Sequence, residues 1–257
     1  MDDKLPLSVL LLVRDEVADV EALLPTLAFA RQVVVVWDPR GDRAARAAAE
    51  RLGAQVIERM FDGFGPQRSA ALAACREDWV LWLDADERLD ATAVTSVRHA
   101  VTRGDGPTHF EFHRVTWFLG RRIRFSGWQG DHVVRLFRRL ESSFDDALVH
   151  ERVLVKGEGP VPVKGTIEHH SYREIQVCVD KMTRYAASGA AQAHRRGRRA
   201  GFLDVLVRPC LRFLRQYILQ LGFLDGVHGL VLCGFASAQV FLKYAHLWRL
   251  GTKEVRR

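Results

Sequence analysis

Two aspartates, Asp84 and Asp86, follow directly after the apolar stretch at residues 80–83. A short apolar run that stops at charged residues is typical of a buried strand in a parallel sheet, and ligands bind at the carboxyl ends of such strands. Side chains two residues apart on an extended chain point the same way, so both carboxylates can face one crevice. Two carboxylates at this spacing suit a divalent cation that takes its other ligands from water and substrate phosphates. The alternative is an acidic turn that caps the next helix, although Asp90 is better placed for that cap.

Acidic residues also follow the two earlier strands that the pattern predicts. Residues 7–13 run into Glu16, and residues 33–37 run into Asp38. In a doubly wound sheet these strand ends line the same crevice as the aspartate pair, where carboxylates can hydrogen-bond to a base and a ribose. Arg68 opens a predicted helix, so it would add a cation and a helix N-terminus beside a diphosphate. The alternative for Arg68 is a plain surface charge.

The first hundred residues alternate strands with helices. Apolar runs predict strands at residues 7–13, 33–37, 54–58 and 79–83, and helical periodicity predicts helices at residues 20–27, 43–52 and 64–74. Pro25 is expected to end the first helix early. This alternation predicts a right-handed, doubly wound, mostly parallel α/β sheet. The sequence contains neither a dinucleotide fingerprint nor a P-loop motif.

The pattern changes beyond residue 105. Short, partly aromatic runs predict antiparallel edge strands at residues 108–116, 121–125, 133–137, 152–155 and 161–169. From residue 172 the chain is expected to be helical, with an apolar face interleaved with cations at residues 203–221 and an apolar helix at 230–248. We therefore expect a nucleotide-binding and catalytic domain at residues 1–171 and a helical extension at residues 172–257.

The composition favours an anionic partner. The 257 residues carry a formal net charge of +7, and residues 195–199 hold four arginines. The four cysteines are widely separated, which argues against a zinc site or a disulfide framework and fits a reducing compartment. The first residues lack the basic region of a signal peptide, and no unbroken apolar run reaches ~18 residues. We therefore expect a cytoplasmic protein whose helical tail either packs on the domain or attaches peripherally to an anionic membrane at its inner face.

An ordered set of motifs resembles the family 2 glycosyltransferases with the GT-A fold. The set begins with Arg14-Asp15-Glu16 and Asp38, continues through Asp62-Gly63-Phe64-Gly65-Pro66-Gln67-Arg68, and centres on Asp84-Ala85-Asp86-Glu87-Arg88. It extends through Gly127-Trp128, Arg135, Val149-His150-Glu151, His170-Ser171-Tyr172, Lys181, Arg184-Tyr185 and Phe223-Leu224-Asp225-Gly226. The resemblance covers nearly the whole chain and is greatest to the branch that includes β-glucosyltransferases of the lipopolysaccharide core.

The resemblance implies an inverting sugar transfer from a nucleotide sugar, expected to be a UDP-sugar, with Mn²⁺ or Mg²⁺ as cofactor. The acceptor would be a hydroxyl of a lipid-linked or saccharide glycan such as the lipopolysaccharide core. Glu16, Asp38, Arg68 and Asp84 would bind the donor, and Asp86 would hold the metal.

Inversion also requires a base that removes a proton from the acceptor hydroxyl. Glu151 is the first candidate for this base, because the acceptor-side carboxylate of the family lies downstream of the aspartate pair; Asp131 and Asp146 are alternatives. His150 could orient Glu151, contact a phosphate or bind the metal. Trp128 and Arg135 are expected to contact the acceptor or a phosphate, although Trp128 could equally be a core aromatic.

Two departures from the family pattern concern the donor. Arg43 stands where the family has a further aspartate, with Asp42 beside it, and Ser69 replaces a common asparagine. Other functions consistent with the sequence are a sugar-phosphate nucleotidyltransferase and a non-enzymatic basic protein that binds membrane or nucleic acid. The chain has no glycine-rich basic segment after its first strand, and it has no zinc-finger, RNP or helix-turn-helix motif, so we expect no nucleic-acid partner.

Overall fold

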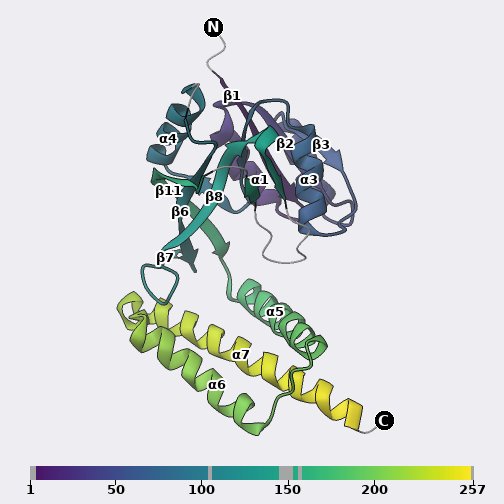
Figure 1. Cartoon of the computed structure of the whole chain (residues 1–257), viewed down its shortest axis with the longest axis vertical. Coiled ribbons are helices and arrows are strands. Elements are labelled where there is room, and N and C mark those ends of the chain that lie inside the picture. The colour runs from purple at the N-terminus through teal and green to yellow at the C-terminus, as the bar shows by residue number, and fades with distance from the viewer. Residues whose placement is uncertain (1–3, 104–105, 145–152, 156–157, 256–257) are drawn as a thin grey trace. The chain divides into compact units, whose positions relative to one another are not determined.

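The computed structural model describes residues 4–103, 106–144, 153–155 and 158–255 (Figure 1). The chain divides into two compact units. Unit 1 comprises Met1–Arg114 and Asp131–His169, and unit 2 comprises Val115–Gly130 and His170–Arg257. The chain enters unit 2 for the second time at residue 170, close to the expected boundary at 171, but residues 115–130 also belong to the helical unit.

In the described residues, the larger sheet has nine strands, in the order β3-β2-β1-β4-β8-β6-β11-β5 with β7 paired to β6. The parallel strands are β1 (Leu5–Val13), β2 (Ala30–Trp37), β3 (Gln55–Glu58) and β4 (Trp79–Trp82). The others are β5 (Glu87–Leu89), β6 (His109–Phe118), β7 (Arg121–Arg122), β8 (Asp131–Arg138) and β11 (Val161–Tyr172). Strand β8 runs antiparallel to both β4 and β6, and β5 runs antiparallel to β11. This arrangement confirms the predicted class, an α/β sheet whose first four strands are parallel and which carries antiparallel strands at one side.

Helices cover both faces of the parallel strands. On β1, Leu7, Val9 and Leu11 point into one apolar core, while Leu10 points into the other. The first core includes residues of α1 (Val17–Leu23), α2 (Arg43–Arg51) and α4 (Ala91–Thr102). The second core includes residues of α3 (Phe64–Ala74) and of the small hairpin formed by β9 (Ser142–Phe144) and β10 (Val153–Val155). The strands are apolar on both sides because each face is buried.

Local signals set several element boundaries. Helix α1 stops before Pro25 and continues as a 3₁₀ turn at Leu24–Leu27, as expected of proline in a helix. The carboxylate of Asp90 accepts a hydrogen bond from the Ala93 amide at 2.7 Å, which confirms the expected N-cap of α4. The same carboxylate accepts hydrogen bonds from the amide and hydroxyl of Thr166, so it also ties α4 to β11.

The described part of unit 2 contains three long helices: α5 (Ile175–Arg195), α6 (Phe202–Leu214) and α7 (Gly226–Val255). Figure 1 shows α7 lying between α5 and α6, and it packs against both. A π-helical turn at Arg215–Leu219 and a 3₁₀ turn at Gly222–Asp225 connect α6 to α7. The expected helix at 203–221 therefore ends earlier, and the expected helix at 230–248 is longer at both ends.

Asp225 of the Phe-Leu-Asp-Gly motif and the nearby Gly229 have structural roles in unit 2. Asp225 is buried and accepts hydrogen bonds from the amides of Arg124 and Phe125 and from the hydroxyl of Ser126. At Gly229, an added Cβ would lie 1.9 Å from the carbonyl oxygen of Gly222, so only glycine allows the two backbones to approach. These contacts fix the connection before α7.

Helix α7 and the turn before it also differ from the sequence expectation. The segment Gly222–Thr252 has 31 residues, and the mean hydropathy of its most apolar window is 1.3. By length and composition it could therefore cross a membrane, and 17% of that window is buried inside the protein. The sequence showed no unbroken apolar run of that length because glycine, serine, glutamine and histidine interrupt it. The core helix of a soluble protein satisfies the same criterion, and α7 has neighbours on two sides.

Candidate functional site

The carboxyl ends of three adjacent strands carry the predicted acidic residues. Strands β2, β1 and β4 are parallel neighbours, so Asp38, Glu16 and the pair at 84 and 86 follow them at one edge of the sheet. The loops after β1 and β2 are joined, because the Asp42 amide donates to the Arg14 carbonyl at 3.0 Å. This arrangement matches the crevice expected for a doubly wound sheet.

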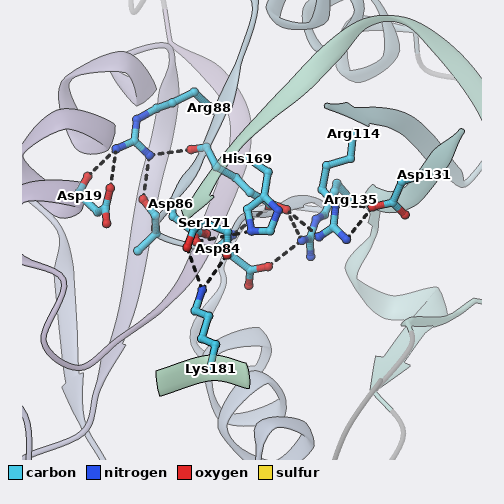
Figure 2. A network of polar contacts seen from close by, with 12 residues as sticks. Asp19, Asp84, Asp86, Arg88, Arg114, Asp131, Arg135, His169, Ser171 and Lys181 are labelled. Carbon is cyan, nitrogen blue, oxygen red and sulfur yellow. Dashed lines mark hydrogen bonds and ion pairs between the residues drawn. The ribbon is translucent and has the colours of Figure 1, made fainter. Parts of the chain in front are cut away.

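Asp84 lies between two guanidinium groups. Its Oδ1 contacts the Nη2 of Arg68 at 3.3 Å. Its Oδ2 contacts the Nη2 of Arg135 at 2.7 Å (Figure 2). Arg135 also donates to the Oε1 of Glu87 at 2.5 Å, and Arg114 reaches the same oxygen at 3.3 Å. The network therefore links residues of α3, β6 and β8 with the turn that leads from β4 into β5.

Three members of this network are almost fully buried. Glu87 is 0% exposed, Arg135 is 2% exposed and Arg68 is 5% exposed. Both guanidinium groups also lie over the ring of Trp82, Arg68 at 4.1 Å and Arg135 at 4.0 Å from its centroid. Charged groups are buried at low cost only when they are paired, so the network is a rigid base under the aspartate turn.

The charges in the network shift one another's pKa values. Burial alone would raise the pKa of Asp84, but the guanidinium groups of Arg135 and Arg68 outweigh it and hold this pKa below its usual range. Burial alone would lower the pKa of Arg135, but the carboxylates of Glu87 and Asp84 hold it above its usual range. Burial lowers the pKa of Arg68 to about 10, so its guanidinium stays protonated at neutral pH.

Replacing Asp84 by asparagine is expected to reduce the decrease in the free energy of unfolding at acid pH. The folded pKa of Asp84 is depressed relative to the ordinary aspartate value of about 3.9. The ionised group therefore contributes stability above that value and loses it as the pH falls through the folded pKa. Urea unfolding at pH values from about 7 down to 3 should show a smaller pH dependence for Asp84→Asn than for wild type. Glu50→Gln on α2 is the control, and parallel curves for Asp84→Asn and wild type would contradict this origin of the acid sensitivity.

Asp86 lies beside His169, for which the sequence predicted no role. Its Oδ2 is 3.4 Å from the Nε2 of His169, near the end of β11 (Figure 2). Both side chains are partly exposed, at 22% for Asp86 and 17% for His169. His169 was missed because its position depends on the antiparallel pairing of β11 with β5, in which His169 lies opposite Glu87.

The pair formed by Asp86 and His169 fits a divalent metal that is held mainly by substrate. Among the described residues, no group of three or more His, Cys, Asp or Glu side chains could enclose a metal ion. The carboxylate of Asp86 leaves most positions to water and to phosphate oxygens, as is usual for Mg²⁺ or Mn²⁺ at a nucleotide, and the imidazole of His169 is a nitrogen donor beside it. These residues therefore fit a metal that binds together with a diphosphate.

The two donor residues predicted from β1 and β2 differ in environment. Asp38 is 5% exposed and forms two-point hydrogen bonds with the guanidinium of Arg40, the shortest at 2.7 Å. These hydrogen bonds lower the pKa of Asp38. Glu16 is exposed and accepts hydrogen bonds from the amides of Arg14 and Asp15, so its carboxylate orders the loop after β1.

Two further ion pairs flank the aspartate turn. Arg88 donates to the carbonyl oxygens of Ala85 and Asp19, and it lies 3.5 Å from the carboxylate of Asp19. Asp131, one of the alternative bases, accepts hydrogen bonds from the guanidinium of Arg114, with the closest contact at 2.7 Å. Asp131 therefore has a cation partner in the described structure.

The remaining predicted site residues lie in unit 2 or outside the described residues. His150, Glu151 and Asp146 lie outside the described residues. Trp128 lies in unit 2, where its ring is 5.5 Å from that of Tyr172 beside a small cavity of about 60 Å³. The roles of these residues stay predictions, as do the donor contacts of Glu16, Asp38, Arg68 and Asp84 and the contact expected of Arg135.

The His-Ser-Tyr motif is explained by contacts within unit 2. Lys181 on α5 donates to the hydroxyl of Ser171 at 2.6 Å and lies 5.0 Å from the ring centroid of Tyr172 (Figure 2). His170 stacks on Trp117 with centroids 5.4 Å apart. These residues secure the end of β11 within its unit.

Comparisons with known proteins agree with the motifs. No family model matches the chain. The chain is 24% identical over 257 residues to the lipopolysaccharide core biosynthesis glycosyltransferase LpsC of Rhizobium meliloti, covering 95% of each protein. It is 23% identical to an uncharacterized glycosyltransferase of Rickettsia prowazekii, covering 96% of this chain and 88% of that protein.

Two solved structures are similar over most of the chain. A mannosyltransferase from Pyrobaculum calidifontis in complex with GDP-Man and Mn²⁺ has 17% identity and a TM-score of 0.49, covering 96% of this chain and 88% of its own. Residues 1–349 of TarS from S. aureus have 15% identity and a TM-score of 0.39, covering 96% and 91%. The names of the sequence relatives confirm the resemblance to glycosyltransferases and support a glycosyltransferase activity for this chain.

Proposed function

We propose that the protein transfers a sugar, with inversion, from a nucleoside diphosphate sugar to a hydroxyl of a membrane-linked glycan such as the lipopolysaccharide core. We take the donor to be a UDP-sugar and the cofactor to be Mn²⁺ or Mg²⁺. The observation that carries the proposal is the pair formed by Asp86 and His169 at the carboxyl edge of the sheet, above a buried network of fixed charge.

The described residues supply distinct parts of the donor site. Asp86 and His169 would hold the metal, which when bound neutralises the charge that develops on the leaving diphosphate. Arg68, protonated at neutral pH, would contact the diphosphate or the nucleotide. Asp38 and Glu16 would bind the nucleotide, and Asp84 the ribose.

Arg135 has a positioning role in this proposal. It is buried and joins Asp84 to Glu87, whose Oε2 also accepts a hydrogen bond from the Asp84 amide at 3.1 Å. The turn that carries the two aspartates is thereby fixed before the donor arrives. A preorganised site avoids reorganisation cost during the reaction.

The acceptor side is assigned to two of the residues predicted from the sequence. We assign proton removal from the acceptor hydroxyl to Glu151, and stacking on a sugar ring to Trp128. We assign sugar transfer to residues 1–171 and membrane attachment to residues 172–257. The enzyme would then act at the cytoplasmic face of the membrane, where nucleotide sugars and a lipid-linked acceptor meet.

The direct test measures release of nucleoside diphosphate from nucleotide sugars with and without Mn²⁺. With purified protein, we expect slow hydrolysis of one or more UDP-sugars that requires Mn²⁺ or Mg²⁺ and stops when EDTA is added. Addition of membranes containing truncated lipopolysaccharide should increase the rate by orders of magnitude, since the acceptor hydroxyl replaces water. Activity that is unaffected by EDTA would contradict the metal role, and release of pyrophosphate from UTP and a sugar phosphate would instead identify a nucleotidyltransferase.

A further inference from the structure

Helix α6 exposes its apolar side chains to solvent. On a helix of 3.6 residues per turn, the exposed residues fall on one half of the circumference. We call this half the α6 face, and it comprises Phe202, Leu203, Leu206, Val207, Leu211 and Leu214. Phe202 is 77% exposed and Leu203 is 70% exposed.

The α6 face is not the side that packs on the rest of unit 2. Pro209 of α6 is buried, and its carbonyl oxygen accepts a hydrogen bond from the hydroxyl of Ser237 on α7 at 2.8 Å. An amphipathic helix normally turns its apolar stripe inward, so an exposed stripe of this size marks an interaction surface.

A basic cavity lies beside α6 within the same unit. It has a volume of about 410 Å³ and lies where the end of α5, the start of α6 and the second half of α7 meet. Its charged lining consists of four cations and one anion: Arg198, Arg199, Arg208, Lys243 and Asp204. The lining thus carries an excess of three positive charges in a volume typical of ligand sites.

Two of the cations are positioned by neighbouring side chains. The Nε of Arg208 donates to the Oδ1 of Asp204 at 2.5 Å, and its guanidinium lies 4.9 Å from the ring centroid of Tyr244. The ammonium group of Lys243 lies 5.9 Å from the same centroid. Asp204 is itself anchored by the Gly201 amide at 3.0 Å, so its carboxylate orients Arg208.

Other cations surround the cavity and the α6 face. Residues 195–252 contain eight arginines and one lysine against two aspartates and no glutamate. On the helical wheel of α6, Arg208 and Arg212 lie on the side opposite the apolar half. A helix with one apolar face and arginines on its other side matches the interface of a bilayer with anionic headgroups.

We propose that the basic cavity binds the phosphate of an anionic phospholipid headgroup while the α6 face lies in the bilayer interface. Guanidinium groups bind phosphate oxygens by charge-assisted hydrogen bonds, and a phosphomonoester offers more oxygens and more charge than a phosphodiester. The inference deepens the proposed function, because it names the surface that holds the enzyme at its acceptor. It does not depend on which sugar is transferred.

The test compares binding of the full chain to vesicles of three compositions. The vesicles contain phosphatidylcholine alone, phosphatidylcholine with phosphatidylglycerol, or phosphatidylcholine with phosphatidic acid, and bound protein is measured by flotation. We expect negligible binding to the first, moderate binding to the second and tightest binding to the third. Equal binding to all three compositions would overturn the proposal.

Two double variants with equal loss of charge separate a site from general electrostatic attraction. Arg208→Gln with Lys243→Gln removes two cations of the cavity, and Arg212→Gln with Arg215→Gln removes two exposed cations outside it. Each cation near an anionic surface contributes about fivefold to binding, so diffuse attraction would weaken both variants equally. We expect the cavity variant to lose about tenfold more affinity for phosphatidic acid vesicles than the control. An equal loss would overturn the cavity as a site.

The apolar face and the source of the phosphate are tested separately. Leu206→Ser with Leu211→Ser should abolish flotation with phosphatidic acid vesicles while leaving the thermal unfolding temperature within a few degrees, because both residues are exposed. Calorimetry with inorganic phosphate should show only weak binding. The proposal would be overturned if inorganic phosphate bound with micromolar affinity while vesicles did not bind. It would also be overturned if the wild-type protein stayed on vesicles during an alkaline carbonate wash.

Failure of this inference and failure of the proposed function give different results. Vesicle binding is measured without nucleotide sugar, and nucleotide-sugar hydrolysis is measured without vesicles. The cavity variant should therefore retain wild-type hydrolysis of the donor, while a protein without transferase activity could still bind vesicles.

Discussion

Replacing Asp86 by alanine is expected to lower the rate of sugar transfer by roughly 10²–10³-fold, the range seen when one preorganised charge-stabilising group is removed. Asp86 is partly exposed, and its carboxylate lies 3.4 Å from the imidazole of His169. Without Asp86, a metal would keep only one of the two protein ligands that this edge of the sheet supplies. The measurement is the rate of nucleoside diphosphate release at saturating Mn²⁺, together with Mn²⁺ affinity in the presence of UDP.

Two further variants give this test its specificity. His169→Ala should also weaken Mn²⁺ affinity in the presence of UDP, because it removes the second protein ligand. Glu50→Ala, an exposed carboxylate on α2, should leave both rate and affinity unchanged. Wild-type turnover and Mn²⁺ affinity in Asp86→Ala would remove the basis of the proposed donor site.

Replacing Arg135 by methionine is expected to lower the free energy of unfolding by about 3–5 kcal/mol, because it breaks a buried ion network by removing one partner. Arg135 is 2% exposed and lies within 2.7 Å of both Asp84 and Glu87. The methionine side chain is similar in length to the arginine side chain but carries no charge. Glu87, which is fully buried, would then have Arg114, at 3.3 Å, as its nearest cation. Urea unfolding at pH 7 measures the effect.

The matched control lies on the same strand. Arg138 is also on β8 and pairs with Asp78, but that carboxylate is half exposed and the pair is accessible to solvent. Arg138→Met should therefore cost only about 1 kcal/mol or less, as for other exposed ion pairs. If the two variants lost similar stability, the buried network would not be the support of the aspartate turn.

Local pattern was sufficient to predict the elements of unit 1 that carry the site. The helix at residues 64–74 and the strand starting at residue 79 were expected from periodicity and apolar content, and both are present. The cap at Asp90 could be predicted because it depends on neighbouring residues alone. The edge of the sheet that gathers Asp38 and Asp86 followed from the rule for parallel strands.

The partners of each charge could not be predicted in the same way. Arg135 was expected to contact phosphate or acceptor, but its nearest partners are Asp84 and Glu87, 51 and 48 residues away in sequence. That pairing depends on the insertion of β8 beside β4, which no local pattern encodes. Strand β5 was also missed, because its three residues, Glu-Arg-Leu, lack both an apolar run and an alternation.

The pairing register of β11 with β5 limits where the chain tolerates insertions and deletions. His169 reaches Asp86 only because β11 pairs with β5 in one register, with Ile167 opposite Leu89, and Asp90 holds that register through Thr166. Shifting β11 by a single residue would turn the imidazole to the other face of the sheet. Insertions and deletions should therefore be tolerated in the loop before residue 161 and selected against between residues 166 and 169.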